Sequence, residues 1–119
     1  MGLVIRTSVF PIRAKYRAKE PWELSVEVEN QGMEAKKVSV VIELPDQVSF
    51  STVGLTNSFE KQFEKFNGGE KASFRMPVFQ TNAADVGYFP GKVIVEEHVH
   101  DFGYVGKTCK KEIPFRIVE

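Results

Sequence analysis

Apolar and polar residues alternate in two runs between Trp22 and Pro45. Side chains alternate between faces along a β-strand, so each run predicts a strand with one apolar and one polar face. The apolar positions are Trp22, Leu24, Val26 and Val28 in the first run, and Val38, Val40, Ile42 and Leu44 in the second. Asn30, Gln31 and Gly32 lie between the runs and tolerate φ > 0, as a hairpin turn requires. The stretch therefore predicts a β-hairpin.

The same alternation recurs on both sides of this hairpin. It predicts strands over 3–9, 12–19, 48–50, 72–78, 93–99 and 104–118. Pro11 separates the first two, which we expect to form a divided edge strand. Residues 87–91 (GYFPG) predict a turn. Phe59, Phe63 and Phe66 recur with a helical period, but the segment is short and ends in a glycine turn, so we favour a strand or irregular structure.

Seven or eight short strands without a long helix are typical of an immunoglobulin-like β-sandwich. Each strand has one apolar face to bury, so two antiparallel sheets are expected to lie face to face. With 119 residues, we expect one domain that spans 1–119.

Charge and cysteine content exclude several classes of function. The 16 Lys and Arg residues offset 16 Asp and Glu residues, which argues against nucleic-acid binding. The single Cys109 forms no internal disulfide. No segment predicts a signal peptide or membrane insertion, so we expect a soluble, cytoplasmic protein unless the chain is a module of a surface protein.

Several turn positions resemble those of CARDB-like and related prokaryotic immunoglobulin-like domains, over residues 22–99. They are Asn30 with Gly32, the closing Leu44-Pro45, the Gly68-Gly69-Glu70 turn, and Pro90-Gly91 before a strand. The resemblance implies a non-enzymatic spacer, adhesion module or partner-binding unit. We therefore predict a non-catalytic module without a cofactor, which presents loops and an edge strand to a protein partner.

Three surfaces are candidates for that partner, and the first is the polar loop over residues 51–58. Arg13, Lys15 and Arg17 lie on one face of the predicted edge strand, whose unpaired backbone groups also suit self-association by strand addition. Tyr88 and Phe89 lie in the predicted aromatic turn. Exposed aromatic rings there suggest carbohydrate recognition as a weaker hypothesis.

One cluster favours an alternative function, namely metal binding. Glu96, His98 and His100 share one face of a predicted strand, where two imidazoles and a carboxylate are close enough to hold one metal ion. Structural zinc usually takes four ligands, and the sequence offers only these three. The alternative to metal binding is that both histidines are solvent-facing residues on a charged strand. No motif for nucleophilic catalysis or phosphate binding is present.

Overall fold

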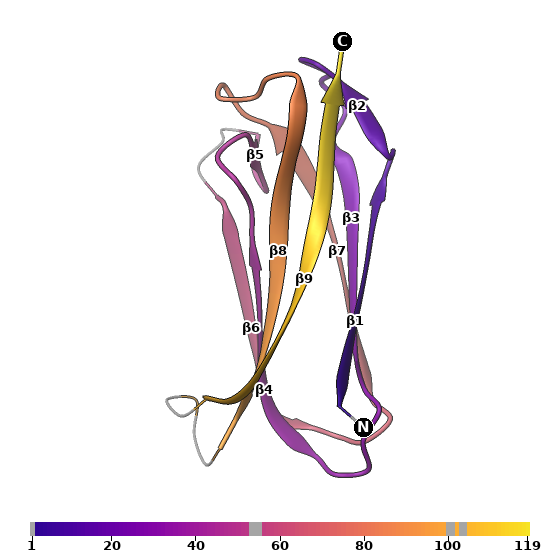
Figure 1. Ribbon diagram of the computed structural model, residues 1–119, viewed down its shortest axis with the longest axis vertical. Helices are drawn as coiled ribbons and strands as arrows, with labels where there is room; N and C mark the ends of the chain where they lie inside the picture. The colour runs from indigo at the N-terminus through magenta and orange to yellow at the C-terminus, as the bar shows by residue number, and fades with distance from the viewer. Residues whose placement is uncertain (1, 53–55, 100–101, 103–104) are drawn as a thin grey trace.

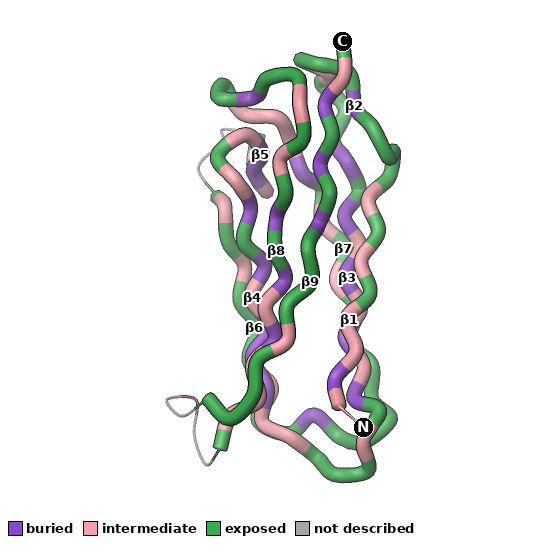
Figure 2. The backbone as a smooth tube through the Cα atoms, viewed as in Figure 1, coloured by how far each residue is buried: buried purple, intermediate pink, exposed green. Residues whose placement is uncertain are grey.

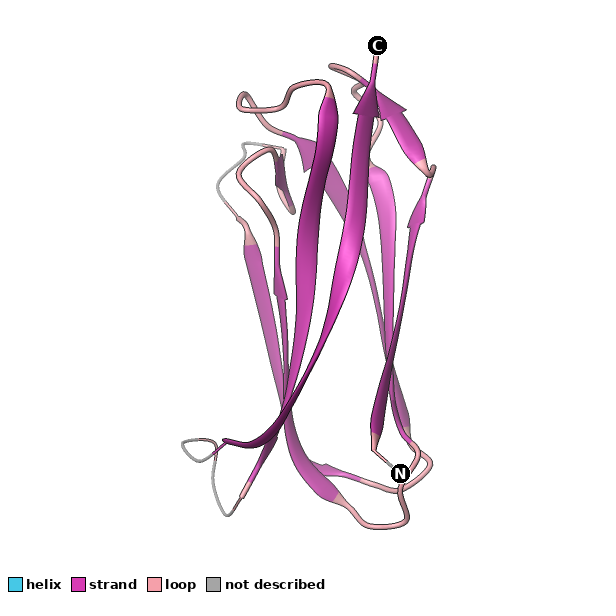
Figure 3. Ribbon diagram, in the orientation of Figure 1, coloured by secondary structure: helices cyan, strands magenta, loops and turns pink. Residues whose placement is uncertain are grey.

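The computed structural model describes residues 2–52, 56–99, 102 and 105–119, and these residues form nine β-strands (Figure 1). The strands are β1 (Leu3–Phe10), β2 (Arg13–Lys15), β3 (Trp22–Asn30), β4 (Lys36–Glu43), β5 (Val48–Ser49), β6 (Ser58–Phe66), β7 (Lys71–Gln80), β8 (Gly87–His98) and β9 (Val105–Val118). No helix occurs in this part of the chain (Figure 3), so none of it is a membrane-crossing helix.

The strands form two sheets. One has four strands in the order β1-β3-β7-β5, and the other has five in the order β2-β9-β8-β4-β6. The five-stranded sheet is curled into a half-barrel, which we call the curled sheet (Figure 1). The prediction of an immunoglobulin-like sandwich of two antiparallel sheets is therefore wrong. The pairing of β2 with β9 is also parallel, so the curled sheet is mixed.

The curl follows from the length of β8 and β9. They have 12 and 14 residues, and strand twist accumulates along a ladder of that length. The sequence prediction placed a turn at 87–91, but these residues belong to β8. Pro90 is paired with Pro114 of β9, and neither can donate a ladder hydrogen bond.

The two prolines are tolerated because no strand flanks them. Because the pair lacks N–H groups, it must occupy a non-hydrogen-bonded site, at which backbone groups face the outer neighbours. The β4 ladder on β8 ends at Lys92, and the β2 ladder on β9 begins only at Arg116. An unbroken β8–β9 ribbon therefore passes through both prolines.

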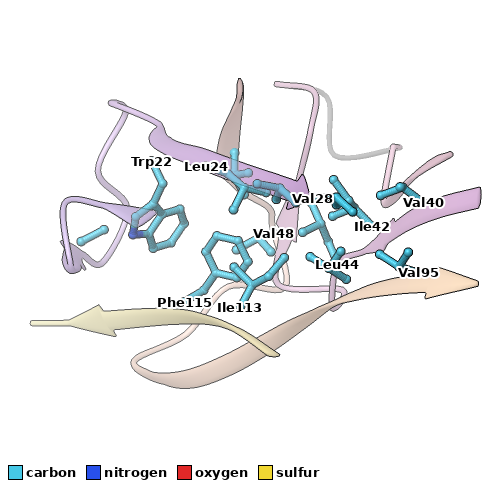
Figure 4. Packing of buried hydrophobic residues seen from close by; sticks show 14 of the residues in the cluster. Trp22, Leu24, Val28, Val40, Ile42, Leu44, Val48, Val95, Ile113 and Phe115 are labelled. Carbon is cyan, nitrogen blue, oxygen red and sulfur yellow. The ribbon is translucent and has the colours of Figure 1, made fainter. Parts of the chain in front are cut away.

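The core lies between the sheets, where the inward side chains of β3 meet those of β4, β8 and β9 (Figures 2 and 4). Trp22 of β3 and Phe115 of β9 are each 1% exposed or less, and their rings meet edge to face with centroids 5.3 Å apart. Such a pair adds about 1 kcal/mol to the burial of two large side chains. The apolar alternation that predicted Trp22 as a core residue is confirmed.

Phenylalanines close the side of the molecule where β6 and β7 approach each other. The ring centroid of Phe74 on β7 lies 5.4 Å from that of Phe59 and 6.4 Å from that of Phe63, both on β6. These residues lie on a strand, so the helical alternative for this segment is wrong. Their spacing departs from strict alternation because the β4–β6 ladder shifts register between Lys36 and Val38.

Asn30 ties together the opposite end of the molecule from the C-terminus. Its buried side-chain amide donates to the carbonyl oxygens of Glu34 at 2.9 Å and Phe66 at 3.0 Å, and accepts from the Gly32 N–H at 3.0 Å. Its backbone N–H donates to the Glu70 carbonyl at 3.0 Å. One side chain at the end of the four-stranded sheet thereby holds the last residue of β6 in the curled sheet.

The turn after Asn30 does not use the positive φ that the sequence predicted there. Among the described residues, positive φ occurs at Arg17, Gly69 and Gly87 instead. The nearby Gly68 is required for a different reason, since a Cβ on it would lie 2.6 Å from the Gly32 carbonyl oxygen. The 30–34 and 67–70 turns therefore pack backbone against backbone.

We expect Asn30→Ala to lower the free energy of unfolding by about 3 kcal/mol, because it removes three hydrogen bonds and leaves the buried Phe66 carbonyl without this partner. Chemical denaturation measures this loss. Gln31→Ala, at the adjacent exposed position, is the control and should change stability by less than about 0.5 kcal/mol. Equal losses in the two variants would show that the Asn30 hydrogen bonds do not hold the turns.

Candidate functional site: a cationic pocket at the end of the molecule

A cavity of about 400 Å³ opens at the end of the molecule near the C-terminus. We call it the end pocket. Three segments distant in sequence meet there: the turn after β2, the chain after β5, and the end of β7 with the loop that follows. The lining residues are Tyr16, Arg17, Ala18, Lys19, Thr52, Phe79, Gln80, Thr81, Asn82 and Ala84. The volume lies in the range of small-molecule sites, about 300–1,000 Å³.

Gln80 clamps the turn after β2 onto β7. Its side-chain amide accepts a hydrogen bond from the Arg17 N–H at 2.9 Å and donates one to the Lys15 carbonyl at 2.8 Å. Arg17 has a φ of 64°, the left-handed region that a residue with a Cβ rarely adopts. This conformation costs about 1–2 kcal/mol, and the two hydrogen bonds from Gln80 offset part of that cost.

Two cationic residues, Arg17 and Lys19, are among those that line the pocket. The Arg17 guanidinium carbon lies 5.1 Å from the centroid of the Tyr16 ring, which orients both side chains at the rim. Lys19 follows two residues later, and its side chain makes no hydrogen bond or ion pair with any described residue. No Asp or Glu is among the lining residues. The described lining therefore carries an excess of positive charge and includes a tyrosine that stacks with an arginine.

The opposite wall is held in place by Thr81. Its hydroxyl donates to the Asp46 carbonyl at 2.6 Å and accepts from the Ala83 N–H at 3.1 Å. Its own N–H donates to the Gln47 carbonyl at 3.0 Å. These bonds fasten the loop after β7 to the turn before β5, so the wall is built by hydrogen bonds rather than by side-chain packing alone.

The basic residues predicted at the edge strand separate in the structure. Arg13 and Lys15 are exposed on β2, whereas Arg17 lies beyond its end, in the turn. The predicted alternation stops at Tyr16, whose N–H still donates to the Val118 carbonyl at 2.7 Å. Of the three, only Arg17 lines the end pocket. That all three bind a partner, or that the edge mediates self-association, stays a prediction.

Tyr88 and Phe89 do not form a joint aromatic patch, because they are adjacent residues of β8 and point to opposite faces. Phe89 packs against the core. Tyr88 is 43% exposed, donates a hydrogen bond to Glu112, and lies under Arg116, whose guanidinium carbon is 5.2 Å from the ring centroid. The two rings share no surface on which a carbohydrate could stack. Their role in partner binding stays a prediction.

The predicted metal ligands are only partly described. His98 is on β8, and its Nε2 lies 2.8 Å from the Ser39 Oγ of β4, while its Nδ1 is buried without a hydrogen-bond partner. Its ring and that of Phe102 pack edge to face, with centroids 5.0 Å apart. His100 lies outside the described residues, which contain no group of three or more candidate ligands. A metal site formed by Glu96, His98 and His100 therefore stays a prediction.

Sequence reasoning missed most of the end pocket. It assigned 80–85 to a polar loop and did not single out Lys19 or Gln80. The available signal was the hydrogen-bonding run Gln80-Thr81-Asn82 directly after an alternating strand. The sequence could not show that this run faces the turn after β2, because 59 residues and a change of sheet lie between Lys19 and Phe79.

Comparisons with known proteins identify the fold. No protein-family model and no curated protein sequence matches the chain. Among solved structures, the chain is similar to AvmM, which catalyzes macrocyclization in alchivemycin A biosynthesis. The alignment covers 99% of this chain and 89% of AvmM, with a TM-score of 0.61 and 12% sequence identity. At that identity the likeness shows the fold alone.

This likeness corrects the predictions that followed from CARDB-like domains. The fold matches AvmM over nearly the whole chain rather than an immunoglobulin-like domain, so that resemblance is wrong. Alternation and turn residues carried it, and unrelated β proteins share both. The prediction of a non-catalytic binding or structural module is wrong as well, because the fold it relied on has been replaced by one that carries catalysis in AvmM.

The Tyr88–Glu112 contact is expected to make the stability of the fold depend on pH. The hydrogen bond to Glu112, with burial and the Glu112 charge, raises the pKa of Tyr88 above its usual 10.0. A raised pKa means that this contact stabilises the fold fully below pH 10, and that the contribution is lost as pH rises through the folded-state pKa. Glu112→Gln removes the charge, so we expect Tyr88 to ionise at lower pH than in the wild type.

Ultraviolet absorbance of tyrosinate follows this ionisation. The chain has three tyrosines, and Tyr88→Phe identifies the share of the signal that belongs to Tyr88. An unchanged Tyr88 ionisation in Glu112→Gln would show that the carboxylate does not hold the phenol proton.

Proposed function

We propose that this chain is an enzyme that acts on a small organic substrate bound in the end pocket. The observation that carries the proposal is the lining itself: the described residues around a cavity of about 400 Å³ include Tyr16, Arg17 and Lys19 and no Asp or Glu. Concave sites with a few convergent polar groups and an apolar wall are the usual places for small-molecule chemistry. Phe79 and Ala84 supply the apolar part of the wall.

These groups suit a reaction that develops negative charge on an oxygen atom. When a nucleophile attacks a carbonyl carbon, a new bond forms at carbon and the π electrons move to oxygen. Arg17 or Lys19 would stabilise that oxyanion electrostatically. The Tyr16 phenol would donate its proton to the oxygen and regain one from solvent. Ring closure within one substrate is one reaction of this type.

The fold likeness supports a catalytic role without specifying the reaction. AvmM catalyzes macrocyclization on the same fold. With 12% identity, neither its substrate nor its catalytic residues carry over to this chain. The reaction class proposed above rests on the chemistry of the pocket in this chain.

The test is turnover by a pair of matched tyrosine variants. Tyr16 and Tyr88 each lie under an arginine, at 5.1 Å and 5.2 Å, but only Tyr16 lines the pocket. Purified protein is incubated with a small-molecule extract of cells that make it, and mass spectrometry records which compounds are consumed. We expect Tyr16→Phe to slow that consumption by about 100-fold or more, and Tyr88→Phe to leave it unchanged.

The proposal fails if the wild-type protein consumes nothing, or if Tyr16→Phe is as active as the wild type. Heat denaturation of both variants is the folding control. Both substitutions remove only a hydroxyl at a surface position, so we expect folded protein in each case.

A further inference from the structure

We propose, building on the function proposed above, that the substrate of the end pocket is an organic anion, and that Gln80 is a positioning residue that presents Arg17 to it. The anionic group would be a carboxylate, sulfonate or phosphate attached to an apolar body. Arg17 and Lys19 recognise the charge, while the rest of the molecule lies against Phe79 and Ala84.

The distribution of charge carries the first part of this inference. The chain as a whole has 16 basic and 16 acidic residues, so a surface of average composition would contain both signs. The pocket contains two cations and no carboxylate among its lining residues. An uncompensated pair of cations in a concave site favours an anion, because low-dielectric walls strengthen the attraction. Arginine in particular makes paired hydrogen bonds to planar oxyanions.

The backbone of Arg17 carries the second part. Its φ of 64° is the only positive φ among the described residues other than glycine. A turn that served only to reverse the chain would be more stable with glycine at this position. The strain is instead maintained by two hydrogen bonds from Gln80, at 2.9 Å and 2.8 Å. Strained backbone that neighbouring groups hold in place is concentrated at functional sites.

The apolar part of the lining indicates what the anion is attached to. Phe79 is half-buried at the end of β7, and Ala84 is only 8% exposed. The Tyr16 ring adds an aromatic surface at the rim. A fully hydrated inorganic ion gains nothing from such a wall, whereas an organic anion buries apolar area against it.

Two fluorescent probes of nearly the same shape separate the anion from the apolar body. Anilinonaphthalene sulfonate carries one negative charge, and phenylnaphthylamine has the same rings without the sulfonate. We expect the wild-type protein to bind anilinonaphthalene sulfonate about tenfold more tightly than phenylnaphthylamine. Added salt should weaken the binding of the sulfonate probe only. Competition by unlabelled benzoate should displace it.

Charge-matched variants locate the site. Arg17→Gln combined with Lys19→Gln should abolish the preference for the sulfonate and leave phenylnaphthylamine binding unchanged. The control combines Arg13→Gln with Lys110→Gln, two exposed cations that do not line the pocket. This control variant loses the same amount of positive charge and should still prefer the sulfonate probe.

A further variant separates recognition from folding. Arg17→Gly relieves the positive φ, so its melting temperature should equal or exceed that of the wild type, while its affinity for the sulfonate falls about tenfold. Gln80→Leu should lower that affinity through loss of the clamp, without changing the charge of the pocket, and should leave phenylnaphthylamine binding unchanged. A merely structural Arg17 would lose stability and affinity together.

The outcomes distinguish this inference from the proposed function. Equal binding of both probes to the wild type, with loss of both in a pocket variant, overturns the anionic substrate but leaves the pocket as a binding site. Failure of both probes to bind overturns the substrate class and the pocket together. A sulfonate preference that survives in the Arg17 and Lys19 double variant places anion binding elsewhere and overturns the inference.

Discussion

The edge-to-face contact between Trp22 and Phe115 is the interaction on which the rest of the structure depends. Trp22 is the first residue of β3 and Phe115 lies near the end of β9, so their contact joins the two sheets close to one end of the molecule. Everything that forms the end pocket is attached near this point. The turn that carries Arg17 and Lys19 leads directly into Trp22, and the burial of the indole therefore fixes where that turn ends.

The opposite end is held by polar rather than apolar contacts. The Asn30 side chain bonds three backbone groups, two in the 30–34 turn and one in β6, and Gly68 allows two turns to touch. The two ends thus differ in how they are stabilised. Near the N-terminus two turns pack backbone against backbone, whereas near the C-terminus hydrogen bonds of Gln80 and Thr81 join the segments around a cavity. A rigid base with an open opposite end is the usual arrangement of a scaffold that positions functional loops.

The likeness to AvmM and the chemistry of the pocket are independent observations. The first concerns the path of the backbone over nearly the whole chain, and the second concerns side chains at one end. A shared fold does not imply a shared function, so the proposed reaction depends on Tyr16, Arg17 and Lys19 of this chain. The strained Arg17 is what distinguishes this pocket from an ordinary gap between loops.

The sequence by itself determined that the chain is all-β, where most strands lie, and that Trp22 and the valines that alternate with polar residues face the core. These features are local, because they follow from the period of two along a strand. It predicted turns at Pro and Gly less well. Pro90 and Gly91 lie inside β8, since the flanking ladders end before they reach the proline.

Tertiary structure alone decided the curl of the five-stranded sheet and the composition of the end pocket. The curl results from twist accumulated over two long paired strands, which no short window of sequence reports. The pocket joins Arg17 to Gln80 through hydrogen bonds across 63 residues. Alternation predicts which face a side chain takes on its own strand, but the meeting of two distant turns depends on how the sheets pack, and that is determined only when the whole core forms.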